Sequence, residues 1–287
     1  GLCHLFDSIM AHCDRRGNVV RKFQYLIAAG LALPCAATAA PVVFKIGGHE
    51  IADAAFLSAL ATTISQLNAP AIIIHGGGPE ITQLQQLMGI VPRYVNGVRI
   101  TDEPSMAVVE MVLAGVVNKR LVRHLIDAGV DAVGLSGVDR GLLRAVKMAH
   151  PDEDMGFTGH ITHVRGEVLR DLLAQGVTPV IAPVCLGEDR PVTYNVNADH
   201  VTGAVAAAVS ARQVVFLTNV EGVLVDGQPM PQLDTLRVNQ LIAQGTIFGG
   251  MIPKVTSALD VLKSGVPQAV ITNLAGLTSH GGTVFTT

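Results

Sequence analysis

The chain has 287 residues, of which 49% are hydrophobic and 15% charged, with a formal net charge of −3. This composition supports a sizeable core and argues against intrinsic disorder. The slight negative charge, the absence of Trp and the 4% aromatic content argue against a nucleic-acid-binding protein. The cysteines show no CxxC spacing and predict neither a disulfide framework nor a zinc site; they are Cys3, Cys13, Cys35 and Cys185.

Residues 1–40 differ in character from the rest of the chain. Basic residues between Arg15 and Lys22 precede an apolar stretch over 25–33, and small residues follow up to Ala40. This is the layout of a secretory signal. A helix that packs on the body or on another subunit, or sequence outside the working protein, would give the same pattern. We therefore treat 1–40 as an N-terminal extension without an assigned role.

From Pro41 onwards, predicted strands and helices alternate. Strands are expected at 42–46, 71–75, 132–135, 178–182, 213–218 and 268–272, with a last edge strand at 282–285. Helices are expected at 53–68, 80–88, 101–128, 167–175, 199–211, 238–245 and 254–264. Two short strands, 143–148 and 159–164, are expected to form a hairpin or flap. The alternation predicts an α/β fold whose mainly parallel sheet is covered on both faces.

The most distinctive stretch is 71–79, AIIIHGGGP. A buried strand ends in His75, three glycines follow, and Pro79 suits the first turn of a helix. Between a strand end and a helix start the backbone N–H groups are unpaired, and glycine lets an anion reach them. A tight βα turn is the alternative interpretation. Glycines also follow two other predicted strands, at 47–48 and at 137, where ligands bind in parallel sheets.

Three charged residues occupy unusual places. Lys45 lies inside a predicted buried strand, where a charge is costly unless it is paired. Lys254 begins a helix, where a positive charge opposes the helix dipole but suits a phosphate ligand. Asp199 lies in the first turn of its helix. Each has an ordinary alternative, namely an edge lysine, a solvated lysine and a helix-start acid. Together with two glycine turns they favour a functional site, although the chain has no P-loop, dinucleotide, G-x-S-x-G or H-E-x-x-H motif.

A resemblance to a known family is carried by nine segments in a fixed order: FKIGG, IIIHGGGPEI, NGVRITD, VEMVLAGVVNK, AVGLSG, TPVIAP, YNVNADH, GGMIPKV and GGTVF. From about 42 to 285 the chain resembles the acetylglutamate kinases of the amino acid kinase family. The resemblance implies a three-layer αβα sandwich. It also implies transfer of the γ-phosphoryl group of MgATP to the side-chain carboxylate of N-acetyl-L-glutamate, in arginine biosynthesis. A carboxylate nucleophile is already ionised at neutral pH and needs no general base.

The resemblance assigns roles to individual residues. The expected catalytic residues are Lys45 and Lys254, which would flank the transferring phosphoryl group, and Asp199 between them. The expected substrate-binding residues are Gly76, Gly77, Arg99 and Asn195. The expected phosphate- and ATP-binding residues are Gly47, Gly48, Thr218, Asn219, Gly222, Gly250 and Met251. Arg99 would pair with the substrate's α-carboxylate, although a surface hairpin arginine is the alternative. ATP and Mg²⁺ are the implied cofactors, and Mg²⁺ is expected to be held by the phosphates, with few or no direct protein ligands.

Two other functions stay open. Asn219 stands where family members commonly have Asp, which suggests a kinase for a carrier-bound aminoadipate or glutamate; the segment 154–159 favours free acetylglutamate instead. A non-catalytic sensor of amino acid or nucleotide is the second alternative, but sensing does not require two lysines and Asp199 together.

The resemblance also suggests how the chain is organised. We expect an N-terminal lobe, 41–190, for the acyl substrate and a C-terminal lobe, 191–287, for ATP, with the boundary at 185–194. We further expect a cytoplasmic homodimer that arginine does not inhibit, with no nucleic-acid or membrane partner. Because ATP is cytoplasmic, the signal-like pattern in the extension is expected to be coincidental.

Overall fold

The computed structural model of the protein describes residues 39–48, 50–225, 227–279 and 281–286. The predicted N-terminal extension therefore lies outside the described residues, apart from its last two. Within the described ranges, no helix combines the length and the apolar character that a transmembrane span requires.

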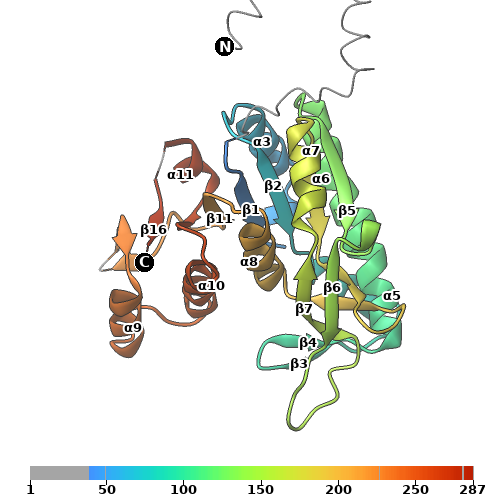
Figure 1. The fold of residues 1–287 in the computed structure, drawn as a ribbon. Coiled ribbons are helices and arrows are strands. Elements are labelled where there is room, and N and C mark those ends of the chain that lie inside the picture. The colour runs from blue at the N-terminus through green and yellow to red at the C-terminus, as the bar shows by residue number, and fades with distance from the viewer. Residues whose placement is uncertain (1–38, 49, 226, 280, 287) are drawn as a thin grey trace, which may run out of the picture. The chain divides into compact units, whose positions relative to one another are not determined.

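An eight-stranded sheet forms the centre of the protein (Figure 1), in the order β14-β16-β15-β11-β1-β2-β8-β5. Every neighbouring pair is parallel except β15 with β16. The predicted mainly parallel sheet is thus confirmed. The strands are β1 (Val42–Ile46), β2 (Ala71–His75), β5 (Ala132–Ser136), β8 (Thr178–Ala182), β11 (Gln213–Leu217), β14 (Gln232–Leu233), β15 (Ala269–Thr272) and β16 (Thr283–Phe285).

The last predicted strand is not at the edge of the sheet. It corresponds to β16, which pairs on one side with β15 and on the other with β14. The edge strand is β14, whose two residues are too few to carry a periodic pattern. The expectation of an edge strand at 282–285 was therefore wrong, because β14 pairs with its outer side and no sequence pattern predicts β14.

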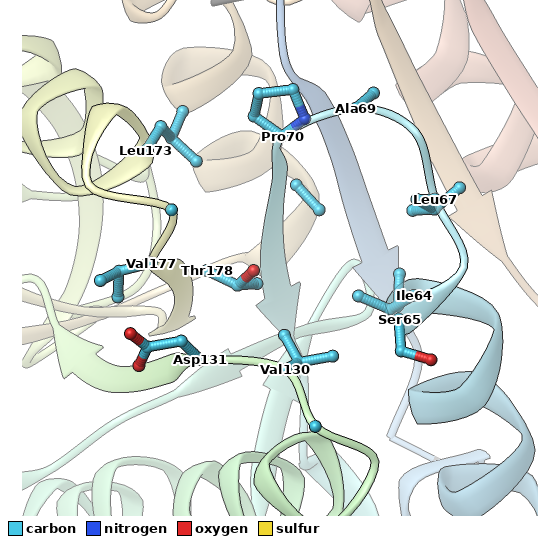
Figure 2. A pocket seen from close by; sticks show the side chains of 13 residues that line it. Ile64, Ser65, Leu67, Ala69, Pro70, Val130, Asp131, Leu173, Val177 and Thr178 are labelled. Carbon is cyan, nitrogen blue, oxygen red and sulfur yellow. The ribbon is translucent and has the colours of Figure 1, made fainter. Parts of the chain in front are cut away.

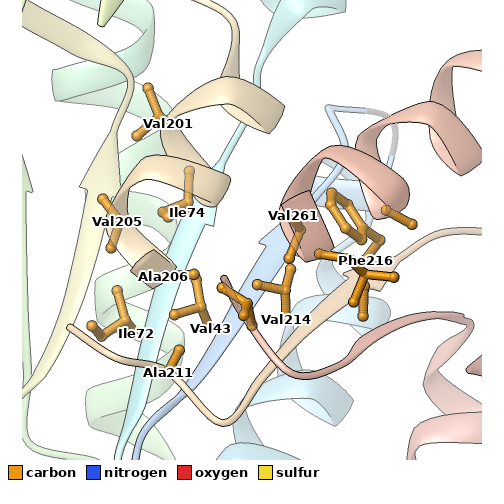
Figure 3. Packing of buried hydrophobic residues seen from close by; sticks show 14 of the residues in the cluster. Val43, Ile72, Ile74, Val201, Val205, Ala206, Ala211, Val214, Phe216 and Val261 are labelled. Carbon is orange, nitrogen blue, oxygen red and sulfur yellow. The ribbon is translucent and has the colours of Figure 1, made fainter. Parts of the chain in front are cut away.

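Side chains of the central strands alternate between two cores, as the pleat requires. In β1, Val43 joins the core beneath α8 and α10, whereas Val42, Phe44 and Ile46 join the core on the opposite face. Figure 3 shows the first core, where side chains of α8 and α10 pack on strands β1, β2 and β11. Two covered faces confirm the three-layer αβα sandwich.

Helices cover both faces of the sheet. One face carries α7 (Gly166–Ala174), α8 (Ala198–Ala208), α9 (Thr235–Ala243) and α10 (Met251–Lys263). The other carries α3 (Ala54–Ser65), α4 (Gly78–Leu87), α5 (Glu103–Glu110), the π-helical segment η2 (Met111–Val117), α6 (Asn118–Asp127) and α11 (Leu274–Ser279).

The predicted long helix at 101–128 is a continuous run of α5, η2 and α6. It begins at Glu103, because Asp102 is the N-cap and its carboxylate accepts a hydrogen bond from Ser105 N at 2.9 Å. The π-helical turns in the middle widen the helix next to the glycine turn after β2. Leu113 and Val117 come so close to Gly77 that a Cβ there would lie 2.6 Å from Leu113 Cδ2. Wide turns of this kind are frequent at functional sites.

Four short strands form a small closed barrel beside the main sheet. The predicted hairpin is confirmed, since β6 (Leu143–Lys147) and β7 (Thr158–Val164) pair antiparallel. The other two, β9 (Val184–Gly187) and β10 (Thr193–Val196), also pair antiparallel. The predicted lobe boundary falls in the turn between them, and the division into lobes stays a prediction. The remaining elements are η1 (Glu50–Ala52), β3 (Arg93–Val95), β4 (Val98–Ile100), η3 (Asp139–Gly141), β12 (Leu224–Val225) and β13 (Gln228–Pro229).

The packing of α8 on the sheet predicts a large loss of stability for Ile72→Ala. Ile72 is 0% exposed, so truncation leaves a cavity and should lower the free energy of unfolding by about 2–5 kcal/mol. Leu87→Ala is the matched control, because Leu87 is 78% exposed and should change stability by less than about 0.5 kcal/mol. Urea unfolding measures both variants, and equal losses would contradict the assigned core.

Candidate active site

The two predicted glycine turns meet at one edge of the sheet. Ile46 pairs with His75 in the parallel register of β1 and β2, so the turns that follow begin side by side. Gly76 N donates a hydrogen bond to Ile46 O at 3.0 Å. A Cβ on Gly48 would lie 2.8 Å from Pro79 Cδ and 3.1 Å from the backbone N of Gly77. The turns therefore touch backbone to backbone, which explains why a side chain is not tolerated at 48.

Lys45 and Asp199 form an ion pair next to the first of these turns. Lys45 lies two residues after Val43 in β1, so its side chain points to the face covered by α8, whose first turn carries Asp199. Lys45 Nζ lies 2.9 Å from Asp199 Oδ1. The ion pair offsets the cost of a lysine in a buried strand.

Lys254 contributes a second cation from the first turn of α10. It lines the same cavity as Lys45, and its ammonium group forms no ion pair or hydrogen bond with the described part of the chain. Asp199 was expected between the two lysines, but it pairs with Lys45 and not with Lys254. Its second oxygen accepts a hydrogen bond of 3.3 Å from Ser257 Oγ. Ser257 lies three residues after Lys254, hence on the same side of α10, but only the packing of α10 on α8 brings it to Asp199, and no sequence motif marks it.

The cavity of ≈ 390 Å³ brings together residues from both halves of the chain. It is lined by Lys45, Gly47, Gly48, Glu50, Asp199, Phe216, Leu217, Thr218, Asn219 and Lys254. Seven of the site residues predicted from the sequence therefore line this one cavity. Glu50 was not predicted, because no motif marks it.

Three predicted ATP-binding residues do not line this cavity. Gly222 packs against Thr283, since a Cβ there would lie 2.6 Å from Thr283 Oγ1. Gly250 is the N-cap of α10, and Met251, the first residue of that helix, packs on the core. Gly137, another glycine after a strand, is in close contact with β9. Close packing thus accounts for a glycine at 137 and at 222, and the ATP-binding role of Gly222, Gly250 and Met251 stays a prediction.

Arg99 is 8% exposed and lies on β4 against α4. Its Nη2 donates to Thr82 Oγ1 at 2.8 Å and to Gly78 O at 3.2 Å, and its Nη1 donates to Gln85 Oε1. The alternative of a surface arginine is therefore wrong. Burial lowers the pKa of Arg99, and no carboxylate among the described residues pairs with the guanidinium. A buried cation without a protein counter-ion suits an anionic ligand.

Asn195 is hydrogen-bonded to the residue that follows β4, the strand that carries Arg99. Its Nδ2 donates to Thr101 Oγ1 at 3.1 Å, and Thr158 Oγ1 donates to Arg99 O at 2.6 Å. The segment 154–159 closes on this strand, because a Cβ on Gly156 would lie 2.3 Å from Thr101 O. The structure thus places Asn195 and Arg99 on one connected framework next to the glycine turn.

A second cavity of ≈ 340 Å³ lies at the opposite edge of the sheet, where β2, β5 and β8 begin (Figure 2). Its lining includes one carboxylate, Asp131, and no lysine, arginine or histidine. Ligands of parallel sheets bind at the carboxyl ends of strands, and this cavity is at the amino ends. It is therefore not the candidate active site.

An αβα sandwich with two lysines and two glycine turns at the carboxyl ends of its strands is the arrangement expected of a phosphate-binding α/β protein. Residues 40–273 match the Amino acid kinase family, and the chain belongs to this family.

Relatives within the family carry a more specific name. A protein of Roseiflexus sp. (strain RS-1) named acetylglutamate kinase is 53% identical over 245 residues, which is 85% of this chain and 93% of the relative. An acetylglutamate kinase of Chloroflexus aurantiacus (strain ATCC 29366 / DSM 635 / J-10-fl) is 46% identical over 244 residues, 85% of this chain and 96% of the relative. The crystal structure of smu.665 from Streptococcus mutans UA159 superposes with a TM-score of 0.72 at 30% identity, covering 86% and 98% of the two chains. The predicted resemblance to acetylglutamate kinases is thus confirmed.

Burial of His75 at the end of β2 predicts a pH-dependent stability. Desolvation lowers the pKa of His75 from 6.5 to about 4, so the unfolded state binds a proton more readily between these values. The contribution of His75 to stability is fully present above pH 6.5 and is lost as the pH falls towards 4. From pH 7.5 to 5 the wild type should lose about 2 kcal/mol more free energy of unfolding than His75→Leu.

Urea unfolding at the two pH values measures this difference. His160→Asn is the matched control, because His160 is exposed and its removal should leave the pH dependence unchanged. A wild-type loss equal to that of His75→Leu would contradict a neutral, buried His75.

Proposed function

We propose that this protein is a kinase that transfers the γ-phosphoryl group of ATP to the side-chain carboxylate of N-acetyl-L-glutamate, in arginine biosynthesis. The product is an acyl phosphate. The observation that carries the proposal is the cavity that Lys45, Asp199 and Lys254 line together with the first glycine turn, Gly47 and Gly48, beside which the second glycine turn packs. Relatives of this family named acetylglutamate kinase, which match nearly their whole length, supply the substrate.

The residues of the cavity suit a reaction in which one anion attacks another. A carboxylate oxygen attacks the γ-phosphorus, the bond to the β-phosphate oxygen breaks, and ADP leaves; no proton has to move. Phosphoryl transfer then depends on positioning and on neutralising charge. Lys45 and Lys254 supply the two positive charges, and Asp199 holds Lys45 in place. The amides of Gly47, Gly48 and Gly77 donate to phosphoryl and substrate oxygens, whereas Gly76, whose N–H already bonds Ile46 O, shapes the turn beside the substrate.

Arg99 binds the α-carboxylate of N-acetyl-L-glutamate in this proposal. A guanidinium can bind a carboxylate through two hydrogen bonds, and its contacts with Thr82, Gln85 and Gly78 O hold it beside the glycine turn. Asn195 hydrogen-bonds the same substrate. On the nucleotide side, Thr218, Asn219, Gly222, Gly250 and Met251 are proposed to contact ATP.

Mg²⁺ would bind with the nucleotide. Two carboxylates line the cavity, those of Glu50 and Asp199, and Asp199 is already paired with Lys45. Within the described ranges no group of three His, Cys, Asp or Glu residues is arranged to hold a metal ion. In this proposal the phosphates hold Mg²⁺, which would supply charge neutralisation.

Neither alternative function is favoured. The acetylglutamate kinase relatives match almost their whole length, which argues for free N-acetyl-L-glutamate over a carrier-bound substrate. Both lysines and Asp199 face one cavity, which argues against a sensor. A homodimer that arginine does not inhibit, acting in the cytoplasm, stays part of the proposal.

The first test is formation of an acyl phosphate, trapped with hydroxylamine, from ATP and N-acetyl-L-glutamate beside glutamate and aspartate. Lys45→Ala and Lys254→Ala should each lower kcat on the order of 10²–10³-fold, because each removes a charge that stabilises the transition state. Lys263→Ala is the matched control, since Lys263 lies on the same helix but is exposed and paired with Asp260; it should keep wild-type kcat. A folded wild type without a signal from acetylglutamate would overturn the proposed function.

Arg99→Lys should weaken binding of N-acetyl-L-glutamate selectively. Lysine keeps the charge but loses the bidentate geometry and the contacts with α4. The KM for N-acetyl-L-glutamate should rise by about 10-fold or more, whereas the KM for ATP stays within about 3-fold. Arg93→Lys, at an exposed position of the same hairpin, serves as the control. Equal increases in both KM values would place Arg99 outside the acyl site.

A further inference from the structure

A chain of hydrogen bonds runs beneath the glycine turn, on the sheet face opposite Lys45. Lys119 Nζ lies 2.9 Å from Gly134 O and 3.1 Å from Asn118 Oδ1. Asn118 Nδ2 lies 3.2 Å from His75 Nε2, and His75 Nδ1 lies 2.9 Å from Gly76 O. Both Asn118 and His75 are 0% exposed. The chain thus links strand β5 to the first peptide of the glycine turn.

The chemistry of the three side chains determines which atom donates and which accepts in each of these hydrogen bonds. An ammonium group only donates hydrogen bonds, so the Asn118 oxygen faces Lys119 and the Asn118 amide donates. One Asn118 hydrogen is donated to Val180 O, 2.9 Å away, and the other lies between His75 Nε2 at 3.2 Å and Leu135 O at 3.4 Å. His75 Nε2 must then accept, which leaves the ring proton on Nδ1, where it is donated to Gly76 O. Burial keeps the pKa of His75 near 4, so the ring is neutral at physiological pH.

The bond to Gly76 O also orients the next amide. In a planar trans peptide the C=O and the following N–H point in opposite directions, so holding Gly76 O aims Gly77 N–H away from His75. Gly77 N lies 3.1 Å from the position of a Cβ on Gly48, so this amide lies beside the other glycine turn. Among the described groups, none accepts a hydrogen bond from Gly77 N.

We propose that His75 is a positioning residue, whose Nδ1–H, held by Asn118 and Lys119, sets the Gly76–Gly77 peptide so that Gly77 N–H binds the transferring phosphoryl group. This inference rests on the proposed function. An apolar residue would suit packing alone, because Ala71 and Ile73 face the same core from the preceding positions of β2. A buried imidazole lowers the stability of the protein in acid, as an apolar residue would not. Its advantage in this proposal is that it orients the Gly76–Gly77 peptide.

Three substitutions of His75 separate positioning from packing. An asparagine amide can reach the place of Nδ1 and donate to Gly76 O, whereas a glutamine amide reaches the place of Nε2 and contacts Asn118. Leucine does neither. We expect His75→Gln and His75→Leu to lower kcat on the order of 10–100-fold with the KM for N-acetyl-L-glutamate within about 3-fold, because the lost amide acts in the transition state. His75→Asn should keep kcat within about 3-fold of the wild type.

Leu173→Ala is the control for destabilisation alone, because Leu173 is a core residue of α7 that lines the cavity at the opposite edge of the sheet. It should lower the melting temperature while kcat stays at the wild-type value. The positioning role is wrong if His75→Asn loses as much kcat as His75→Leu, or if all three His75 variants keep it.

A spectroscopic measurement tests the same inference without activity. Nitrogen-15 NMR of the histidine ring should show a protonated Nδ1 and an unprotonated Nε2 from pH 6 to 8, and a proton on Nε2 would overturn the proposal. If the wild type makes no acyl phosphate, the proposed function fails, and the ring tautomer still decides whether His75 holds the glycine turn.

Discussion

The parallel register of β1 and β2 is the constraint on which the rest of the site depends. Because Ile46 lies opposite His75, both strands end at the same level and their glycine turns meet. The pleat then sends Lys45 to the face of α8 and α10, and His75 to the face of η2 and α6. A slip of one residue would exchange the two faces, burying the lysine among apolar side chains.

The site concentrates positive charge that the protein only partly neutralises. Lys45 has Asp199 as its partner, whereas Lys254 and Arg99 have no counter-ion among the described residues. Unpaired cations lower the stability of a free protein, and two extensive apolar cores offset that loss. The same charges suit a reaction between a carboxylate and a triphosphate, where repulsion between the anions is the main obstacle.

Each face of the sheet contributes something different to this chemistry. The α8 and α10 face supplies the charged groups, Lys45, Asp199 and Lys254, that line the cavity. The opposite face supplies a buried polar chain through His75 and Asn118, which is rigid because every member has a fixed partner. The wide π-helical turn beside Gly77 brings Asn118 under strand β2. The charged side chains and the hydrogen bonds that hold the glycine turn thus come from opposite faces of the sheet.

The sequence alone determined the long strands, their mainly parallel arrangement and the nine ordered segments that identify the family, because buried β-branched runs and glycine turns are local signals. It also marked Lys45, Asp199 and Lys254. The tertiary structure decided that β14 covers β16, that Arg99 is buried, and that Ser257, Glu50 and Asn118 belong to the site. These facts depend on pairings between residues far apart in the chain, such as Asn118 with His75 and Ser257 with Asp199, and local patterns carry no information about such contacts.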